Sequence, residues 1–158
     1  PFSEGFFHFF SIGSYGVLSG NMIQWFSKIM MEGKGMRGIR GAITVAQNDK
    51  QEIHEAAQQM MREILRQNGL DTEAIGAVIC TMTEDLTAAF PTAGIRTLPG
   101  FELVPLFDAR QCAIDGTLPL CIRVLVLADI DLPQRGVRHV YLGKAANLRP
   151  DIAAADKL

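Results

Sequence analysis

The chain has 158 residues, 48% hydrophobic and 20% charged, and its 15 Lys and Arg against 17 Asp and Glu give a formal net charge of −2. A chain of this length normally forms one domain and can bury a core without disulfides or metal ions. The nearly balanced charge excludes the strong field of one sign on which nucleic-acid binders and disordered tails depend.

Cysteine and histidine usage argues against a disulfide framework and against a metal centre. The three cysteines are odd in number and follow no C-x-x-C spacing: Cys80, Cys112 and Cys121. The three histidines are far apart in the sequence: His8, His54 and His139. We therefore expect a reducing, cytoplasmic compartment and no metal ion.

The first 35 residues differ from the rest of the chain. They are rich in Phe, and no Lys, Arg, Asp or Glu occurs between Phe6 and Phe26. Gly, Ser, Asn and Gln interrupt this run, and Glu4 stands where a signal peptide would carry positive charge, so we expect no membrane span. Residues 1–35 are interpreted as an N-terminal extension without a catalytic role, with an added leader or an interfacial helix as alternatives. The globular domain is then 36–158.

From residue 36 onward the pattern is that of a globular domain. Residues 37–45 alternate β-forming and small residues, which predicts a strand. Asp49 with Glu52 three positions later resembles a capping box, and apolar residues then recur at helical spacing. Asn68-Gly69 is typical of a helix end, so a helix is predicted between these two signals.

The second half of the chain mixes strands with one short helix. Pro91 is placed at the first turn of a helix that runs toward Leu98, and residues 108–116 are predicted to form a loop. The remaining predicted elements are strands at 77–82, 103–107, 121–128 and 138–142. The fold class is therefore α/β, or α+β with a mixed sheet.

Arginine is the residue type that stands out chemically, because no motif for a catalytic nucleophile or a phosphate-binding loop is present. Arg40 and Arg123 lie within apolar strand segments, where a charge needs a partner. A buried ion pair and a bound anion satisfy this requirement equally well. His139 and Tyr141 alternate along the last strand and share one face, although a lone strand histidine is more often structural.

Five segments follow one another along the chain: Arg37-Gly38-Ile39-Arg40-Gly41-Ala42, Glu84-Asp85-Leu86 with Ala89-Phe90-Pro91, Cys121-Ile122-Arg123-Val124-Leu125, Arg138-His139-Val140-Tyr141-Leu142 and Leu148-Arg149-Pro150-Asp151. Taken together, over residues 36 to about 151, they resemble the AroH-type monofunctional chorismate mutases. Separated motifs in the same order make a chance agreement very improbable.

The resemblance implies a homotrimer with a pseudo α/β-barrel arrangement and active sites between subunits. It implies an isomerase that converts chorismate to prephenate by an intramolecular Claisen rearrangement, in phenylalanine and tyrosine biosynthesis, without a cofactor. Such a rearrangement needs no proton transfer and no covalent intermediate. The enzyme has instead to hold a dicarboxylate in a compact shape and to stabilise the charge that separates as the ether bond breaks.

The resemblance also assigns roles to individual residues. Arg123 is expected to donate to the ether oxygen, and Arg40 and Tyr141 to bind a carboxylate. The other positions implied for substrate binding line the pocket, form its rim or close over it: Phe90, Thr92, Arg96, Phe107, Leu148 and Arg149.

Two positions depart from the family pattern. Better-known members supply a Cys and, three residues later, a Glu toward the ring hydroxyl, where this chain has Asp108 and Gln111. Gln111 can still form a hydrogen bond but carries no charge, so the hypothesis is that Asp108 restores the negative charge. Two alternatives to an active mutase stay open: a trimeric metabolite-binding protein without turnover and, more weakly, an imine deaminase of similar fold.

Overall fold

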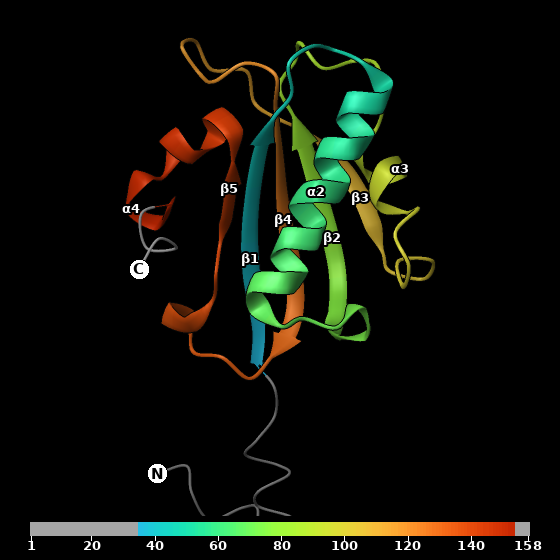
Figure 1. The fold of residues 1–158 in the computed structure, drawn as a ribbon, viewed down its shortest axis with the longest axis vertical. Coiled ribbons are helices and arrows are strands. Elements are labelled where there is room, and N and C mark those ends of the chain that lie inside the picture. The colour runs from blue at the N-terminus through green and yellow to red at the C-terminus, as the bar shows by residue number, and fades with distance from the viewer. Residues whose placement is uncertain (1–34, 154–158) are drawn as a thin grey trace, which may run out of the picture. The chain divides into compact units, whose positions relative to one another are not determined.

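The computed structural model describes residues 35–153, which form a five-stranded sheet with two helices on one face and a short last helix beside one edge (Figure 1). Most of the expected N-terminal extension therefore lies outside the described residues. The strands are β1 (Gly35–Thr44), β2 (Ile75–Met82), β3 (Leu106–Arg110), β4 (Cys121–Ile130) and β5 (Val140–Leu142), and the α-helices are α2 (Lys50–Asn68), α3 (Pro91–Ile95) and α4 (Pro150–Ala153). Short 3-10 helices lie at Thr72–Ala74, Gln134–Gly136 and Gly143–Leu148. The expected mixed α/β class is confirmed.

The strand order is β3-β2-β4-β1-β5, so β3 and β5 form the two edges of the sheet. β4 runs antiparallel to its neighbours β1 and β2, whereas β5 is parallel to β1 and β3 is parallel to β2. Strands from the two ends of the chain therefore meet in the middle of the sheet. This pairing brings the arginine-bearing segments of β1 and β4 side by side.

Helix α2 begins and ends as the sequence predicts. The Asp49 side chain accepts hydrogen bonds from the amides of Gln51 (2.8 Å) and Glu52 (3.0 Å), and the helix ends before Gly69, whose φ of 56° suits glycine. The Glu52 carboxylate does not return to Asp49 as a capping box would. It accepts from the amide of Ala46 (3.0 Å) and also from that of the next residue, which fixes the turn between β1 and α2.

The apolar face of α2 packs directly on the sheet and makes the main core. Its fully buried residues include Ile53, Met60 and Ile64. Met60 and Ile64 approach β1 closely at Gly41, where an added Cβ would lie 3.0 Å from Met60 Sδ and 3.0 Å from Ile64 Cδ1, and also 2.7 Å from Val124 Cγ1 of β4. Glycine is required there because no side chain fits, and the close contact fixes the height of β1 beneath the helix.

The predicted third strand was displaced by a few residues. β3 spans 106–110 rather than 103–107, so the predicted loop from 108 begins only after Arg110. The apolar residues before β3 belong to an irregular segment, in which Val104 is buried against the core while Leu103 is exposed. Pairing with β2 sets the strand instead, because Cys80 and Thr81 lie opposite Asp108 and Ala109.

The last strand is shorter than predicted, because residue 138 is taken out of the sheet. The Arg138 amide donates to Asn68 Oδ1, and Asn68 Nδ2 donates to the Arg138 carbonyl, both at 2.9 Å. This side chain at the end of α2 satisfies both backbone groups. β5 consequently begins at Val140, where pairing with Gly41 starts.

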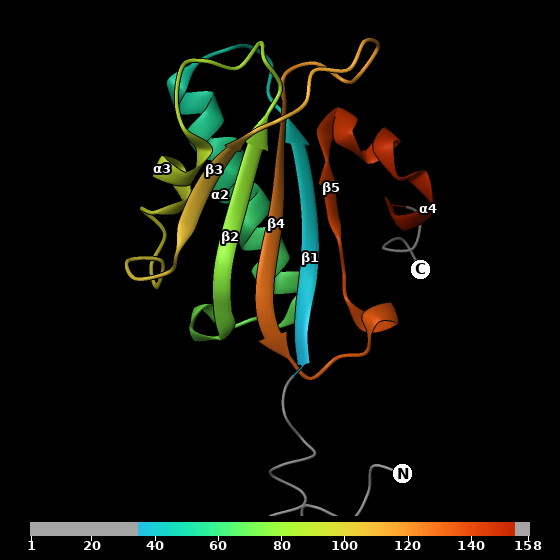
Figure 2. The ribbon, with the colours of Figure 1, turned by 180° about the vertical axis from the view of Figure 1, so that it is seen from behind.

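No described helix covers the second face of the sheet (Figure 2). On β4, Ile122 and Val124 point into the α2 side, so Arg123 and Leu125 point to this open face. Strand pairing places Ala42 of β1 and Thr81 of β2 on either side of Arg123. Within residues 35–153, no helix combines the length and the apolarity needed to cross a bilayer.

Candidate active site

A pocket of about 540 Å³ lies on the open face of the sheet. Its lining comes from four strands and the segment after β5: Arg40, Gly41, Ala42, Ile79, Thr81, Arg123, Val124, Leu125, Tyr141, Leu148 and Arg149. Three of these side chains are arginines and none of the lining residues is acidic. The pocket therefore has the volume of a small-ligand site and the charge to hold an anion.

Arg123 stands near the middle of the pocket, on the central strand of the sheet. Its guanidinium Nε is buried and has no hydrogen-bond partner within the described part of the chain. Among residues 35–153, no Asp or Glu forms an ion pair with it. Of the two explanations for a charge in this strand, the bound anion is the one that fits, because an unpaired buried donor is costly.

Arg40 enters the pocket from β1, and its backbone is held by an unusual partner. The Arg40 amide donates to His139 Nδ1 at 3.1 Å. The pKa of His139 lies below its ordinary value, chiefly because the ring is partly buried and also because the positive charges of Arg40 and Arg149 are near. The imidazole is thus held neutral and can accept this hydrogen bond.

The segment after β5 forms one wall of the pocket. Tyr141 and Leu148 pack on a small apolar cluster of Ala42, Cys121 and Ala145, which is separate from the main core. Arg149 is oriented by Asp151, with Nε and Nη2 donating to the two carboxylate oxygens at 2.9 and 2.7 Å. This pairing raises the pKa of Arg149, so its charge is retained beside the pocket.

Gln111 lies beside the pocket without lining it. The Thr81 hydroxyl, which does line the pocket, donates to Gln111 Oε1 at 3.3 Å. The family resemblance implied that Gln111 lies near the substrate, whereas no motif singled out Thr81. Only the strand register, which sets Thr81 opposite Arg123, identifies it. Ile79 and Leu125 were missed for the same reason, since aliphatic strand residues are normally assigned to the core.

Asp108 lies on the opposite side of the sheet from Arg123. It pairs with Cys80, which faces α2, and it accepts a short hydrogen bond from the Thr92 hydroxyl of α3. Its second carboxylate oxygen is buried without a hydrogen-bond partner. Within one chain, the sheet separates Asp108 from Arg123, so the sequence hypothesis that groups Asp108 and Gln111 at one hydroxyl does not hold for a single protomer.

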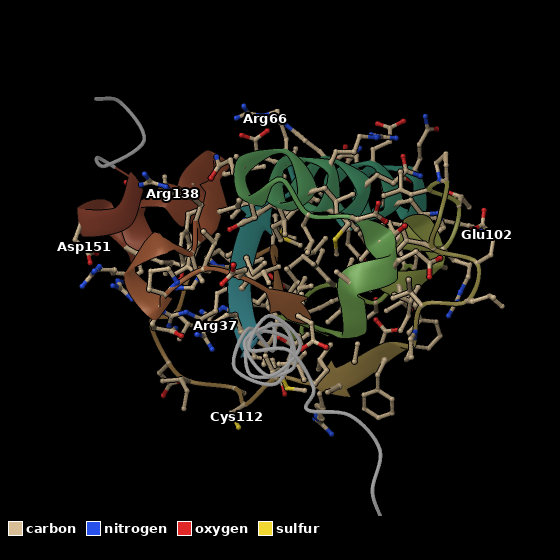
Figure 3. The ribbon with its side chains drawn as sticks, turned by 90° about the horizontal axis from the view of Figure 1, so that it is seen from below. Arg37, Arg66, Glu102, Cys112, Arg138 and Asp151 are labelled. Carbon is tan, nitrogen blue, oxygen red and sulfur yellow. The ribbon has the colours of Figure 1, made fainter. Side chains whose placement is uncertain are left out.

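The remaining predicted residues lie on β3 and around α3 and do not line the pocket. Phe90 and Phe107 are 66% and 65% exposed. Arg96 acts as a structural clamp, because Nη1 donates to the carbonyls of Phe101, Glu102 and Val104 at 3.1 to 3.3 Å. Figure 3 shows Glu102 and Asp151 on opposite flanks of this domain. The predicted site is thus divided into two groups, one in the pocket on β1, β4 and β5 and the other on β3 and around α3.

The chain is similar to known proteins in both sequence and fold. Residues 36–152 match the family model of chorismate mutase type I. Chorismate mutase AroH of Thermus thermophilus is 48% identical over 121 residues, covering 76% of this chain and 98% of that protein. The Bacillus subtilis (strain 168) AroH is 37% identical over 118 residues, covering 75% and 93%.

The fold is also similar to that of a solved chorismate mutase structure. A chorismate mutase from Clostridium thermocellum superposes with a TM-score of 0.68 at 35% identity, covering 70% of this chain and 98% of that one. The family resemblance inferred from the motifs is therefore confirmed. With its arginine-lined pocket on the open face of the sheet, the chain belongs to the chorismate mutase type I family.

Proposed function

We propose that the protein isomerises chorismate to prephenate, the step that serves phenylalanine and tyrosine biosynthesis. The observation that carries this proposal is the buried, unpartnered Nε of Arg123 in a pocket lined by three arginines and no carboxylate. Such a pocket binds a dicarboxylate and keeps one cationic donor free for charge that develops during the reaction.

The mechanism follows from the need to fold one flexible molecule and to stabilise a departing oxygen. Arg40 and Tyr141 bind a carboxylate and hold the substrate in its compact, reactive shape. Arg123 donates to the ether oxygen as negative charge builds up when the C–O bond breaks. Gln111, positioned by Thr81, is available to hydrogen-bond the ring hydroxyl. Leu148 covers the pocket edge and helps to exclude water.

Incubation with chorismate tests this function directly. The ultraviolet absorbance of chorismate should fall with time, and prephenate should accumulate in equal amount. Binding of chorismate without loss of absorbance would favour a metabolite-binding protein. Release of ammonia from an imine, with chorismate left unchanged, would favour the deaminase alternative.

The active enzyme is proposed to be a homotrimer with composite sites. Ile79, Leu125 and Leu127 make an apolar surface on the open face, and Phe90 and Phe107 are exposed at the β3 edge. Contact between the open face of one copy and the β3 edge of the next would bury both surfaces. This head-to-tail contact closes into a ring with threefold symmetry.

Such a ring resolves the division of the predicted site. Within one chain, β3 is four strand spacings, about 19 Å, from the β5 strand that carries Tyr141, and Asp108 with its partner Thr92 lies on the sheet face opposite Arg123. In the ring, Phe90, Thr92, Phe107 and Asp108 of one copy reach the pocket of its neighbour, while Arg40, Arg123 and Tyr141 come from that neighbour. Arg96 keeps its structural clamp and forms the rim.

Mixing two defective variants provides a test of the composite site. Arg123→Ala and Asp108→Lys should each be almost inactive alone, the second because its cation opposes Arg123 of the neighbouring copy. After the two are unfolded and refolded together, roughly a quarter of the sites in random trimers should be intact. Native mass spectrometry monitors mixing and a chorismate assay measures activity. Mixed trimers without recovered activity would show that the site lies within one chain.

The proposed charge on Asp108 is tested by Asp108→Asn, which keeps an acceptor for Thr92 and removes the carboxylate. We expect kcat to fall roughly 10- to 100-fold, because a charged partner contributes about 1.5–3 kcal/mol. Asp129→Asn is the matched control, since Asp129 is an exposed carboxylate on β4 outside the pocket lining. Unchanged turnover in Asp108→Asn would remove Asp108 from the catalytic group.

We further propose that residues 36–158 are the catalytic domain, with 1–35 as an extension, and that the enzyme is cytoplasmic. The match to the family model begins at residue 36, which supports this division. All three cysteines are free, and burial is the main cause that raises the pKa of the Cys80 thiol to about 12. Free thiols of this kind are typical of a reducing compartment.

A further inference from the structure

We propose that His139 is a positioning residue that sets the placement of Arg40 in the pocket by accepting the hydrogen bond of the Arg40 amide. The proposal rests on the proposed function, which gives Arg40 a substrate carboxylate to bind. The contact itself joins backbone to ring, since the Arg40 amide donates to His139 Nδ1 at 3.1 Å.

The imidazole extends the pairing of β1 with β5 by one residue, before the start of β5. Regular pairing starts at Gly41 and Val140, so the Arg40 amide lies one residue before the paired stretch. His139 satisfies this amide with a side-chain acceptor. The backbone on either side of Arg40 is therefore fixed, by β4 along one edge of β1 and by His139 along the other.

His139 is itself held in place from helix α2. Asn68 bonds both backbone groups of Arg138, at 2.9 Å each, and so anchors the residue that precedes His139. A continuous set of contacts thus runs from the end of α2 through Asn68 and His139 to Arg40. The Arg40 side chain is exposed on the open face, and no carboxylate among residues 35–153 pairs with it. The direction of the Arg40 side chain therefore depends on the position of the β1 backbone.

The contact requires the neutral ring, with Nδ1 unprotonated and the proton on Nε2. Two charged groups face the ring. They are Arg40 from β1 and Arg149, which follows the last 3-10 helix and is paired with Asp151. Helix α2 contributes only the neutral Asn68 to this segment. Two positive neighbours disfavour the imidazolium. Protonation at acidic pH would turn an N–H toward the Arg40 N–H and break the contact.

Two substitutions at His139 give side chains of nearly equal shape, and only one of them keeps a hydrogen-bond acceptor. Comparing them distinguishes the effect of the acceptor from the effect of side-chain size. Asn carries an oxygen where His carries Nδ1, whereas Leu has the same branched shape and no acceptor. His139→Leu should raise the KM for chorismate roughly fivefold to tenfold with a smaller effect on kcat, as expected for one lost hydrogen bond. His139→Asn should restore KM to near the wild-type value.

The pH profile gives a second readout that a purely structural role would not move. In the wild-type enzyme, KM should rise as the pH falls below the lowered pKa of His139, while in His139→Asn it should stay flat over the same range. Thr44→Val is the control, since it removes another side-chain acceptor that links β1 to the segment after β5, the Thr44 hydroxyl that accepts from the Lys144 amide at 3.1 Å. Its KM should equal that of the wild type.

Combination with Arg40→Ala distinguishes this inference from the proposed function. If His139 acts through Arg40, then His139→Leu adds nothing to the raised KM of Arg40→Ala. An additive effect, or equal KM values for His139→Leu and the wild type, would overturn the positioning role alone. An unchanged KM in Arg40→Ala would overturn the assignment of Arg40 and the positioning role with it. Nitrogen NMR of the full chain at pH 6.5 should show neutral His139 protonated at Nε2, and an imidazolium there would contradict the proposal.

Discussion

Replacement of Arg123 with alanine is expected to lower kcat/KM for chorismate by about 100- to 1000-fold, a loss of about 2.7–4 kcal/mol of transition-state stabilisation. The guanidinium belongs to a strand residue whose two neighbours are buried in the core. In the described part of the chain its Nε bonds to no protein group, so it stays available to a ligand in the pocket. A donor that is already oriented and desolvated stabilises the departing oxygen without reorganisation. Removing it should therefore lower kcat more than it raises KM.

Arg123→Lys should recover only part of this loss, because lysine keeps the charge but not the planar fork of donors. Arg62→Ala is the matched control. Arg62 lies on the exposed face of α2 and, among residues 35–153, its side chain donates only to Gln58, so its removal should leave kcat unchanged. Steady-state assays with chorismate on folded proteins measure all three. Near-normal turnover in Arg123→Ala would refute the proposed mechanism.

Phe101→Ala is expected to lower the free energy of unfolding by about 3–5 kcal/mol. Phe101 is 0% exposed and is among the largest fully buried side chains in the described part of the chain. Its amide donates to the Leu98 carbonyl, and its own carbonyl accepts from Arg96. These backbone bonds do not depend on the side chain and hold the segment between α3 and β3 in place. Removing the buried ring therefore leaves a cavity.

Leu103→Ala, two residues further on, is the control for Phe101→Ala. Leu103 is 95% exposed, so the same kind of truncation should change stability by no more than about 0.5 kcal/mol. Urea unfolding followed by circular dichroism gives both values. Protomer concentration must be equal in all samples, because assembly stabilises the folded state. Equal midpoints for the two variants would show that Phe101 does not support the core.

Helix α2 was predicted nearly to the residue because its start and end signals are local. Asp49 caps its own helix and Gly69 terminates it, and neither contact depends on distant residues. β3 was misplaced because strands are fixed by partners that are remote in sequence. The apolar letters from Leu103 onward fit a strand, but only pairing with β2 decides that the strand begins at Leu106.

The candidate site shows the same division. Residue type and position in an apolar strand singled out Arg40 and Arg123, because an isolated charge there needs a counterpart. The position of Asp108 could not be predicted, because the register of β3 against β2 decides which face of the sheet its side chain lies on. His139 was given a structural interpretation because a single letter does not reveal that its ring accepts the amide of Arg40.

The sheet order has a consequence for how the protein is made. β1 is the first described strand, yet both of its neighbours come from the last third of the domain. During synthesis β1 must wait until nearly the whole domain has left the ribosome before either edge can pair. Contacts of such long sequence separation raise contact order and slow folding. Helix α2 follows β1 immediately and packs on it, so it can shield this strand from aggregation in the meantime.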